Sequence, residues 1–141
     1  MKELAAIINE AEARERLLGA LGYVVKHEQG TFAQFQPPIT GMWPVDLMLV
    51  NDATFNKVHA QAVDRKVAGR VHKVPSALHL IALKLHAIKY GPPGRHDKDL
   101  SDIVELIELQ KINTASKDFS DMCEHYGTAE LRDEIRTRLE C

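Results

Sequence analysis

The chain has 141 residues, of which 45% are hydrophobic and 27% are charged, and its formal net charge is −2. This length fits one domain, and the composition excludes an intrinsically disordered chain. The small negative charge also argues against a wide nucleic-acid footprint, although it is compatible with a local basic patch.

Cysteine content and the start of the chain indicate a cellular compartment. Cys123 and Cys141 are too few for a disulfide framework, so we interpret both as reduced thiols. Acidic residues run through the first turns of the chain, which argues against a signal peptide or an anchor. No apolar run approaches the ~18–20 residues that span a bilayer. We therefore expect a cytoplasmic protein with no membrane partner.

The first elements are predicted to be a helix and a hairpin. Apolar residues recur near helical spacing over residues 3–21, and Gly22 is a typical helix-ending residue. Residues 23–36 contain two runs of strand-favouring residues that are separated by Gln29-Gly30. This pattern predicts a hairpin that turns at that dipeptide.

A strand, a short helix and a second hairpin are predicted next. Residues 44–50 form an apolar run that predicts a buried strand. Asn51 or Asp52 can cap the short helix that follows. The second hairpin is predicted to turn at Ala68-Gly69.

The remainder of the chain is predicted to be helical. Ser76 can cap a helix that ends at Gly91, and Asp97 is the predicted cap of the next helix. Two further helices are predicted over residues 115–125 and 128–139.

This order of elements predicts an α+β fold with a mixed or antiparallel sheet. We expect the sheet in a first part, residues 1–75, and a helical C-terminal part over residues 76–141, packed as a single compact unit.

Asp46 is the first residue whose chemistry does not fit its surroundings. It is a carboxylate in a strand that is otherwise apolar on both faces. Burial of a carboxylate is costly unless it meets a partner or a metal ion. Because Pro44 places Asp46 near the start of the strand, the residue by itself favours a position that faces solvent.

Lys84 is a second such residue. On a helix its neighbours one turn away or adjacent in sequence are apolar: Leu80, Ile81, Leu85 and Ile88. A lysine in this setting can extend its ammonium group to solvent. Alternatively, it is held at the edge of a cleft as a point charge for phosphate.

A cluster of charges follows the Gly-Pro-Pro-Gly segment. Asp99 and Asp102 are three residues apart, so they share one helix face, and they lie in the first turns, where the helix dipole favours negative charge. In most proteins, two aspartates at these positions would simply stabilise the start of the helix. Together with Arg95 and Lys98, they are also compatible with the polar wall of a cleft.

These residues together resemble the second half of AbiEii-like minimal nucleotidyltransferases, a group of the polymerase-beta-like superfamily. The strand pattern hydrophobic-Asp-hydrophobic is matched at Asp46, and a Leu-x-x-x-Lys-Leu pattern is matched from Leu80 to Leu85, with Lys84 as the lysine. The resemblance covers roughly residues 1–110.

A third motif of this family, Arg-x-Lys-Asp-x-x-Asp, is matched with one inserted residue by Arg95, Lys98, Asp99 and Asp102. The resemblance implies transfer of a nucleoside monophosphate from an NTP to a hydroxyl group of an RNA or protein acceptor. Asp46 would be a catalytic carboxylate and metal ligand.

The other motif residues would then complete the site. Lys84 would neutralise phosphate charge, and Asp99 and Asp102 would order the cleft wall. The family name also implies a bacterial toxin–antitoxin setting.

One part of the family pattern is missing. The family begins with Gly-Ser or Gly-Gly followed by Asp-x-Asp, and residues 1–45 contain neither motif. The first predicted helix is similar to the helix that follows Asp-x-Asp. Mg²⁺ is therefore expected only if the missing segment is supplied, or if another acid, such as Glu28 on the neighbouring strand, replaces it.

Three interpretations follow from this departure. The first is that the chain is a fragment or shortened member of such an enzyme and is incomplete or inactive as it stands. The second is a non-catalytic scaffold that binds a protein or nucleic-acid partner. The third is an α+β domain whose charges serve capping and solubility.

The missing strands would leave Val24, Val25, Phe32 and Phe35 partly exposed. We therefore expect a homodimer or a complex with a partner protein.

Overall fold

The computed structural model divides the chain into two compact units, Met1–Ala60 and Gln61–Cys141, and each is described by itself. The predicted α+β class, with a mixed sheet and a helical C-terminal region, is confirmed. The structure describes residues 4–8, 18–30, 32–91 and 93–141.

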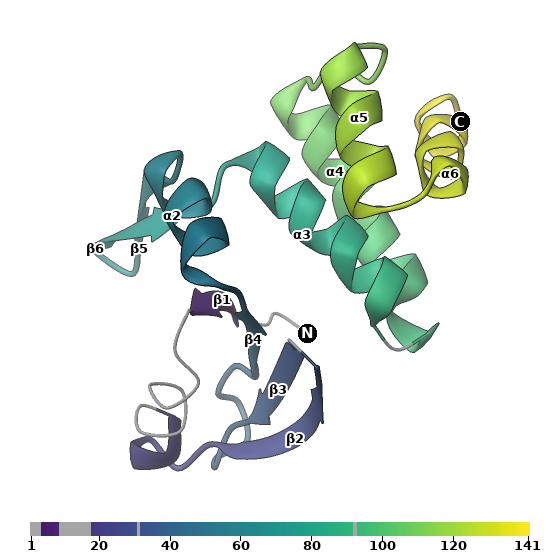
Figure 1. Ribbon diagram of the computed structural model, residues 1–141. Coiled ribbons are helices and arrows are strands. Elements are labelled where there is room, and N and C mark those ends of the chain that lie inside the picture. Colours follow the sequence, from purple (N-terminus) through teal and green to yellow (C-terminus); the bar gives the residue numbers. More distant parts are fainter. Residues whose placement is uncertain (1–3, 9–17, 31, 92) are drawn as a thin grey trace. The chain divides into compact units, whose positions relative to one another are not determined.

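The first unit contains a four-stranded mixed sheet, in which β4 and β3 lie between two edge strands (Figure 1). Strand β4 runs parallel to β1 and antiparallel to β3, which is antiparallel to β2. In sheet order the strands are β1 (Leu4–Ile8), β4 (Val45–Leu49), β3 (Phe32–Gln36) and β2 (Val24–Gln29).

The helix predicted over residues 3–21 is wrong at its start, because Leu4–Ile8 forms β1. A short apolar run fits a helix and a buried strand equally well by periodicity. The pairing with β4, with Ala5 opposite Asp46, is a contact between distant parts of the sequence. Residues 9–17 of the predicted helix lie outside the described residues.

The predicted helix end at Gly22 is confirmed. Residues 18–20 are helical, and Gly22 has a φ of +80°, which favours glycine. The backbone N–H of Tyr23 donates to the Leu18 carbonyl at 2.9 Å, and the N–H of Gly22 donates to the Gly19 carbonyl at 3.0 Å. These are the hydrogen bonds of a helix C-terminus that ends in a left-handed residue.

The core of the first unit lies on one face of the sheet. In strand β3, buried residues alternate with partly buried or exposed ones. Its buried Ala33 and Phe35 lie opposite Leu47 and Val45 of β4, and these four pack with Leu18. Because successive side chains of a strand point to opposite faces, Asp46 lies on the other face.

Helix α2 (Asp52–Ala60) follows β4. The side-chain oxygen of Asn51 accepts a hydrogen bond from the Thr54 backbone N–H at 2.8 Å. Of the two caps expected from the sequence, this bond identifies Asn51.

The second unit begins with the predicted second hairpin, β5 (Val63–Val67) and β6 (Arg70–Val74). The two turn residues, Ala68 and Gly69, have φ values of +50° and +78°. Positive φ at both central residues is the backbone of the tight turn that matches the twist of two antiparallel strands. The division expected after residue 75 would have placed this hairpin with the first sheet.

The rest of the second unit is a bundle of four helices (Figure 1). Helix α3 begins after Ser76, whose hydroxyl accepts from the His79 backbone N–H, and ends at Gly91, as predicted. The helices are α3 (Ala77–Tyr90), α4 (His96–Gln110), α5 (Lys117–Tyr126) and α6 (Ala129–Leu139).

The predicted cap of α4 is wrong. Helix α4 begins at His96, and the residue at its cap position is Arg95, which makes no side-chain capping bond. A 3-10 turn, η1 (Pro93–Arg95), leads directly into the helix. Because this turn already has helical backbone angles, the extended residue that a capping side chain requires does not form at Asp97.

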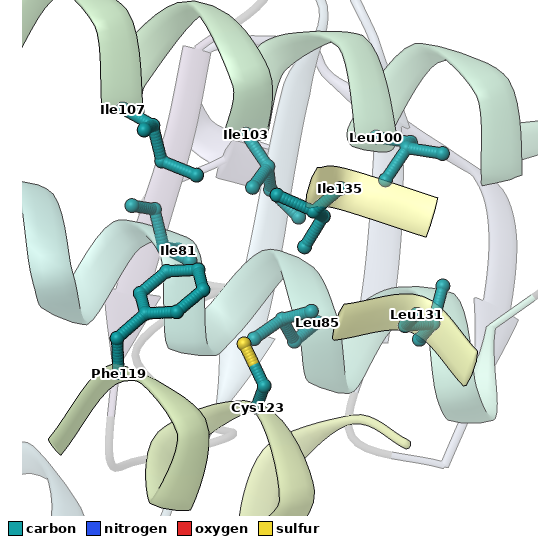
Figure 2. Close-up of a cluster of buried hydrophobic side chains, with 9 residues drawn as sticks. All are labelled: Ile81, Leu85, Leu100, Ile103, Ile107, Phe119, Cys123, Leu131 and Ile135. Carbon is teal, nitrogen blue, oxygen red and sulfur yellow. The ribbon is translucent and has the colours of Figure 1, made fainter. Parts of the chain in front are cut away.

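Buried side chains from all four helices form one core (Figure 2). Helices α3 and α4 supply most of them, and Phe119 and Cys123 of α5 lie against them. The full set is Ile81, Leu85, Leu100, Ile103, Ile107, Phe119, Cys123, Leu131 and Ile135. Within the described part of the chain, no helix has both the length and the apolarity needed to cross a bilayer.

Candidate functional site

Lys84 of α3 is held by two aspartates of α4. Its Nζ atom lies 3.1 Å from Oδ1 of Asp99 and 2.7 Å from Oδ2 of Asp102. Both carboxylates reach the same ammonium group because they are three residues apart on one helix face, as the sequence predicted. The sequence suggested that the Lys84 ammonium group either extends to solvent or binds phosphate. Neither alternative included an ion pair with Asp99 and Asp102.

Arg95 contacts the same cluster from the end of η1. Its Nε atom lies 3.5 Å from Oδ2 of Asp99, so this carboxylate lies between two cations. The Asp99 side chain is 1% exposed, whereas that of Asp102 is 37% exposed. Asp99 is therefore the inner member of the cluster, and Asp102 is its outer member.

The charge state of Lys84 follows from its surroundings. Burial alone would lower the pKa of the Lys84 ammonium, but its hydrogen bonds to Asp102 and Asp99 and their charges outweigh burial and raise the pKa above 10.5. The lysine therefore stays charged at physiological pH. With Arg95 the cluster contains two cations and two anions, so it attracts a phosphate less strongly than an unpaired lysine would.

Lys98, the remaining residue of the predicted cleft wall, has an exposed side chain on α4. Adjacent residues of a helix are separated by about 100° around its axis. Lys98 therefore lies about 100° from Asp99 around the helix axis, and one turn before Asp102.

Asp46 belongs to the first unit, on the interior strand β4, and is 3% exposed. The expectation that it faces solvent is therefore wrong, because its side chain is buried on the sheet face opposite to that of Val45 and Leu47. Its register partners are Ala5 of β1 and Gln34 of β3. Neither partner carries a carboxylate.

Glu28, expected as a replacement ligand on a neighbouring strand, does not lie beside Asp46. Strand β2 is separated from β4 by β3. Glu28 is opposite Ala33, and Ala33 is opposite Leu47. Register partners share a face and sequence neighbours do not, so Glu28 lies on the sheet face opposite to that of Asp46.

In the part of the chain that the structure describes, these positions do not by themselves form a magnesium site. Two-metal phosphoryl or nucleotidyl transfer needs several carboxylates around the ions. Among the described residues, no group of three His, Cys, Asp or Glu side chains is placed to hold a metal. Asp46 can therefore supply one ligand, and the remaining ligands would have to come from other residues.

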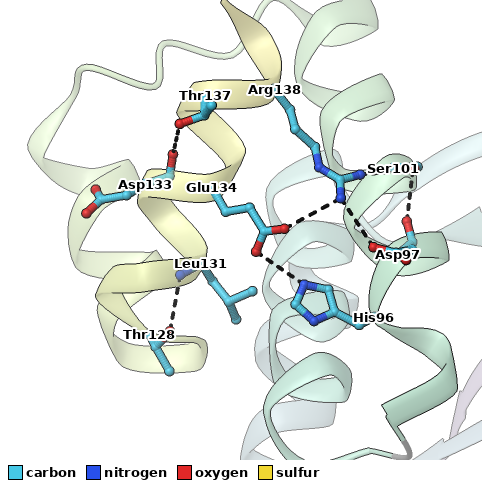
Figure 3. A network of polar contacts seen from close by, with 9 residues as sticks. All are labelled: His96, Asp97, Ser101, Thr128, Leu131, Asp133, Glu134, Thr137 and Arg138. Carbon is cyan, nitrogen blue, oxygen red and sulfur yellow. Dashed lines mark hydrogen bonds and ion pairs between the residues drawn. The ribbon is translucent and has the colours of Figure 1, made fainter.

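A second polar network connects α4 to α6 (Figure 3). The His96 Nε2 atom is 3.2 Å from a carboxylate oxygen of Glu134. Arg138 contacts Asp97 at 3.3 Å and Glu134 at 3.5 Å. Sequence reasoning missed Glu134 and Arg138, although their spacing of four residues on a predicted helix indicates an ion pair.

An open pocket of about 370 Å³ lies next to this network, on α4 and α6. The residues predicted to form a cleft wall do not line it. Its lining residues are Ser101, Val104, Glu105, Glu108, Arg138 and Cys141.

Comparison with known proteins gives no family assignment. No family model matches this sequence, and a search of curated proteins finds no match.

Proposed function

We propose that this protein is a nucleotidyltransferase-like scaffold that does not transfer nucleotides as this chain alone. The proposal combines the resemblance of three sequence motifs with the chemistry of the positions that they occupy. We further propose that the protein is cytoplasmic, and the resemblance implies a bacterial toxin–antitoxin setting.

The observation that carries the proposal is the composition of the sheet around Asp46. The residues opposite it on the two adjacent strands are Ala5 and Gln34. A methyl group and an amide do not replace the carboxylates that nucleotidyl transfer requires. One buried carboxylate is not enough to bind the metal ions that align an NTP with an attacking hydroxyl group.

The Lys84 cluster supports the same interpretation. A lysine that neutralises a transferred phosphate acts as a point charge. Here the ammonium group already contacts two carboxylates, one of them buried. We propose that Lys84 joins α3 to α4, and that its role is to stabilise the bundle.

A second candidate is an enzyme completed by another polypeptide segment. Strand β1 is an edge strand next to β4, and within the described residues it pairs with β4 alone. An added strand could carry carboxylates to this side of the sheet. In that assembly the donor would be an NTP with Mg²⁺, and the acceptor would be a hydroxyl group of an RNA or a protein.

A label-transfer assay tests the proposal. The chain is incubated with each α-labelled NTP, Mg²⁺, and total RNA or protein from a bacterial lysate as acceptors. We expect no transfer above background and no difference between the wild-type chain and Asp46→Asn. Transfer by the wild-type chain that is lost in Asp46→Asn and retained in Glu28→Gln would overturn the scaffold proposal.

A further inference from the structure

The hairpin β5–β6 is exposed on both of its faces. All five residues of β5 and four of the five residues of β6 are exposed, and Val74 is partly buried. A two-stranded hairpin without a covered face is marginally stable in water. Such an element is therefore expected to have a role in which both faces are used.

The hairpin carries a concentrated positive charge. Between residues 63 and 74 there are four lysines and arginines and one aspartate, which gives a formal charge of +3 with His72 neutral. The complete chain has a net charge of −2, so the remaining residues carry −5. This is a local basic patch on an acidic protein.

The cations are divided between the two faces. Cross-strand partners share a face, and successive residues alternate. Arg65 is paired with His72 and Val67 with Arg70, which places both arginines on one face. The pairs of Asp64 with Lys73 and of Lys66 with Val71 place both lysines on the other.

We propose that the β5–β6 hairpin is an arm that enters the major groove of double-stranded DNA. An element inside a groove has a phosphate backbone on each side, so cations on both of its faces can reach phosphate groups. A membrane surface or the flat surface of an acidic protein would require cations on one face. The major groove of B-form DNA is wide enough for a two-stranded ribbon.

Other features of the hairpin favour a DNA duplex over the alternative nucleic acids. Residues 63–74 contain no Phe, Tyr or Trp, the residues that usually form stacking platforms for single-stranded bases. The major groove of duplex RNA is too deep and narrow for side chains to read. Val67 and Val71 are 47% and 67% exposed, and an exposed methyl group can contact the methyl group of thymine.

The turn prepares the arm for binding. Ala68 and Gly69 adopt positive φ angles that fit the strand twist. An ion pair of 2.8 Å between Lys73 and Asp64 links the strands on one face. A preorganised element loses less conformational freedom on binding than a flexible tail does.

Fluorescence anisotropy with a labelled DNA duplex of mixed sequence tests this proposal, which is independent of the proposed function at Asp46. We expect salt-dependent binding with a Kd on the order of 10⁻⁵ M at low salt. The double substitution Arg65→Gln and Arg70→Gln should weaken binding by about tenfold or more, and should reduce the slope of log K against log salt by about 1.8.

Two further variants separate charge from folding. Arg65→Lys with Arg70→Lys keeps the charge and should retain most of the binding. Lys111→Gln with Lys117→Gln removes the same charge from exposed positions outside the hairpin and should leave binding unchanged.

Three results would overturn the proposal. These are no binding of DNA by the wild-type chain, equal weakening by the hairpin and control variants, and tighter binding of duplex or single-stranded RNA than of duplex DNA. Retained binding by the arginine-to-lysine variant, together with an unchanged circular dichroism spectrum of the glutamine variant, supports the proposal.

Discussion

Lys84 and Asp99 form an ion pair between α3 and α4, with 3.1 Å between the lysine Nζ and the carboxylate Oδ1. The aspartate is 1% exposed, so its negative charge has almost no access to water. A buried charge is tolerated when cations and hydrogen bonds replace its hydration. The pair therefore adds a charged contact to the apolar packing of α3 on α4, and losing the lysine would leave the buried aspartate with less compensation.

The first prediction follows from this contact. Lys84→Met should lower the free energy of unfolding by about 2–4 kcal/mol, because it leaves Asp99 buried with Arg95 as its remaining cation. Urea denaturation followed by circular dichroism measures the loss.

A control uses the outer member of the cluster. Asp102 is 37% exposed, so Asp102→Asn should cost less than about 1 kcal/mol. Equal losses of unfolding free energy for Lys84→Met and Asp102→Asn would show that the Lys84–Asp99 ion pair does not contribute more than the Lys84–Asp102 pair.

Cys123 gives a second prediction, for alkaline pH. Burial raises the pKa of the Cys123 thiol from 9.0 to about 11. Between these values the unfolded chain loses the thiol proton while the folded chain keeps it. The free energy of unfolding should therefore fall as pH rises from 9.0 to about 11, by roughly 2–3 kcal/mol.

The variant Cys123→Ala separates this titration from the others. It should be less stable at neutral pH, because a methyl group replaces a fully buried thiol. Its stability should decline less steeply between pH 9.0 and about 11 than that of the wild-type chain. Parallel declines would contradict the assigned thiol pKa.

A third prediction concerns assembly through the edge strand β2. Val24 and Val25 are 61% and 50% exposed on this strand, whereas Phe35, also expected to be exposed, is 3% exposed. Exposed apolar edges tend to pair with other strands. We predict a homodimer in sedimentation equilibrium at micromolar concentration.

Charge on the edge strand should prevent this assembly. Val25→Lys is expected to give a monomer, because a charged edge opposes strand pairing. Val71→Lys, at an equally apolar exposed position in the other sheet, is the control and should stay dimeric. A monomeric wild-type chain would refute the prediction.

A fourth prediction concerns the position opposite Asp46. Ala5→Asp would place a second carboxylate on the parallel strand beside it. Without a divalent cation, this change should destabilise the protein by about 1–3 kcal/mol, because it adds a second negative charge at the register partner of the buried Asp46. Mg²⁺ or Mn²⁺ should restore part of the loss in thermal denaturation of the variant and should not affect Ala5→Asn.

Local sequence signals predicted much of this fold. The Ser76 cap, the Gly91 helix end and the turn at Ala68-Gly69 each depend on residues close together in the chain, and all three are confirmed. The prediction that Asp97 caps α4 is wrong, because the 3-10 turn η1 leads into the helix without a capping side chain.

Contacts between distant residues could not be predicted in the same way. The run Leu4–Ile8 is compatible with either a helix or a strand, and its parallel pairing with β4 decides between them. Similarly, the spacing of Asp99 and Asp102 predicted a shared face. That this face meets Lys84 depends on how α3 packs against α4.

The most direct measurement is calorimetry of each NTP with Mg²⁺ on the wild-type chain and on Asp46→Asn. Our prediction is weak or undetectable heat for both proteins, since Asp46 has Ala5 and Gln34 as its register partners in the sheet. Micromolar binding by the wild-type chain that is abolished in Asp46→Asn would contradict it, because such binding requires a metal-competent set of ligands around this aspartate.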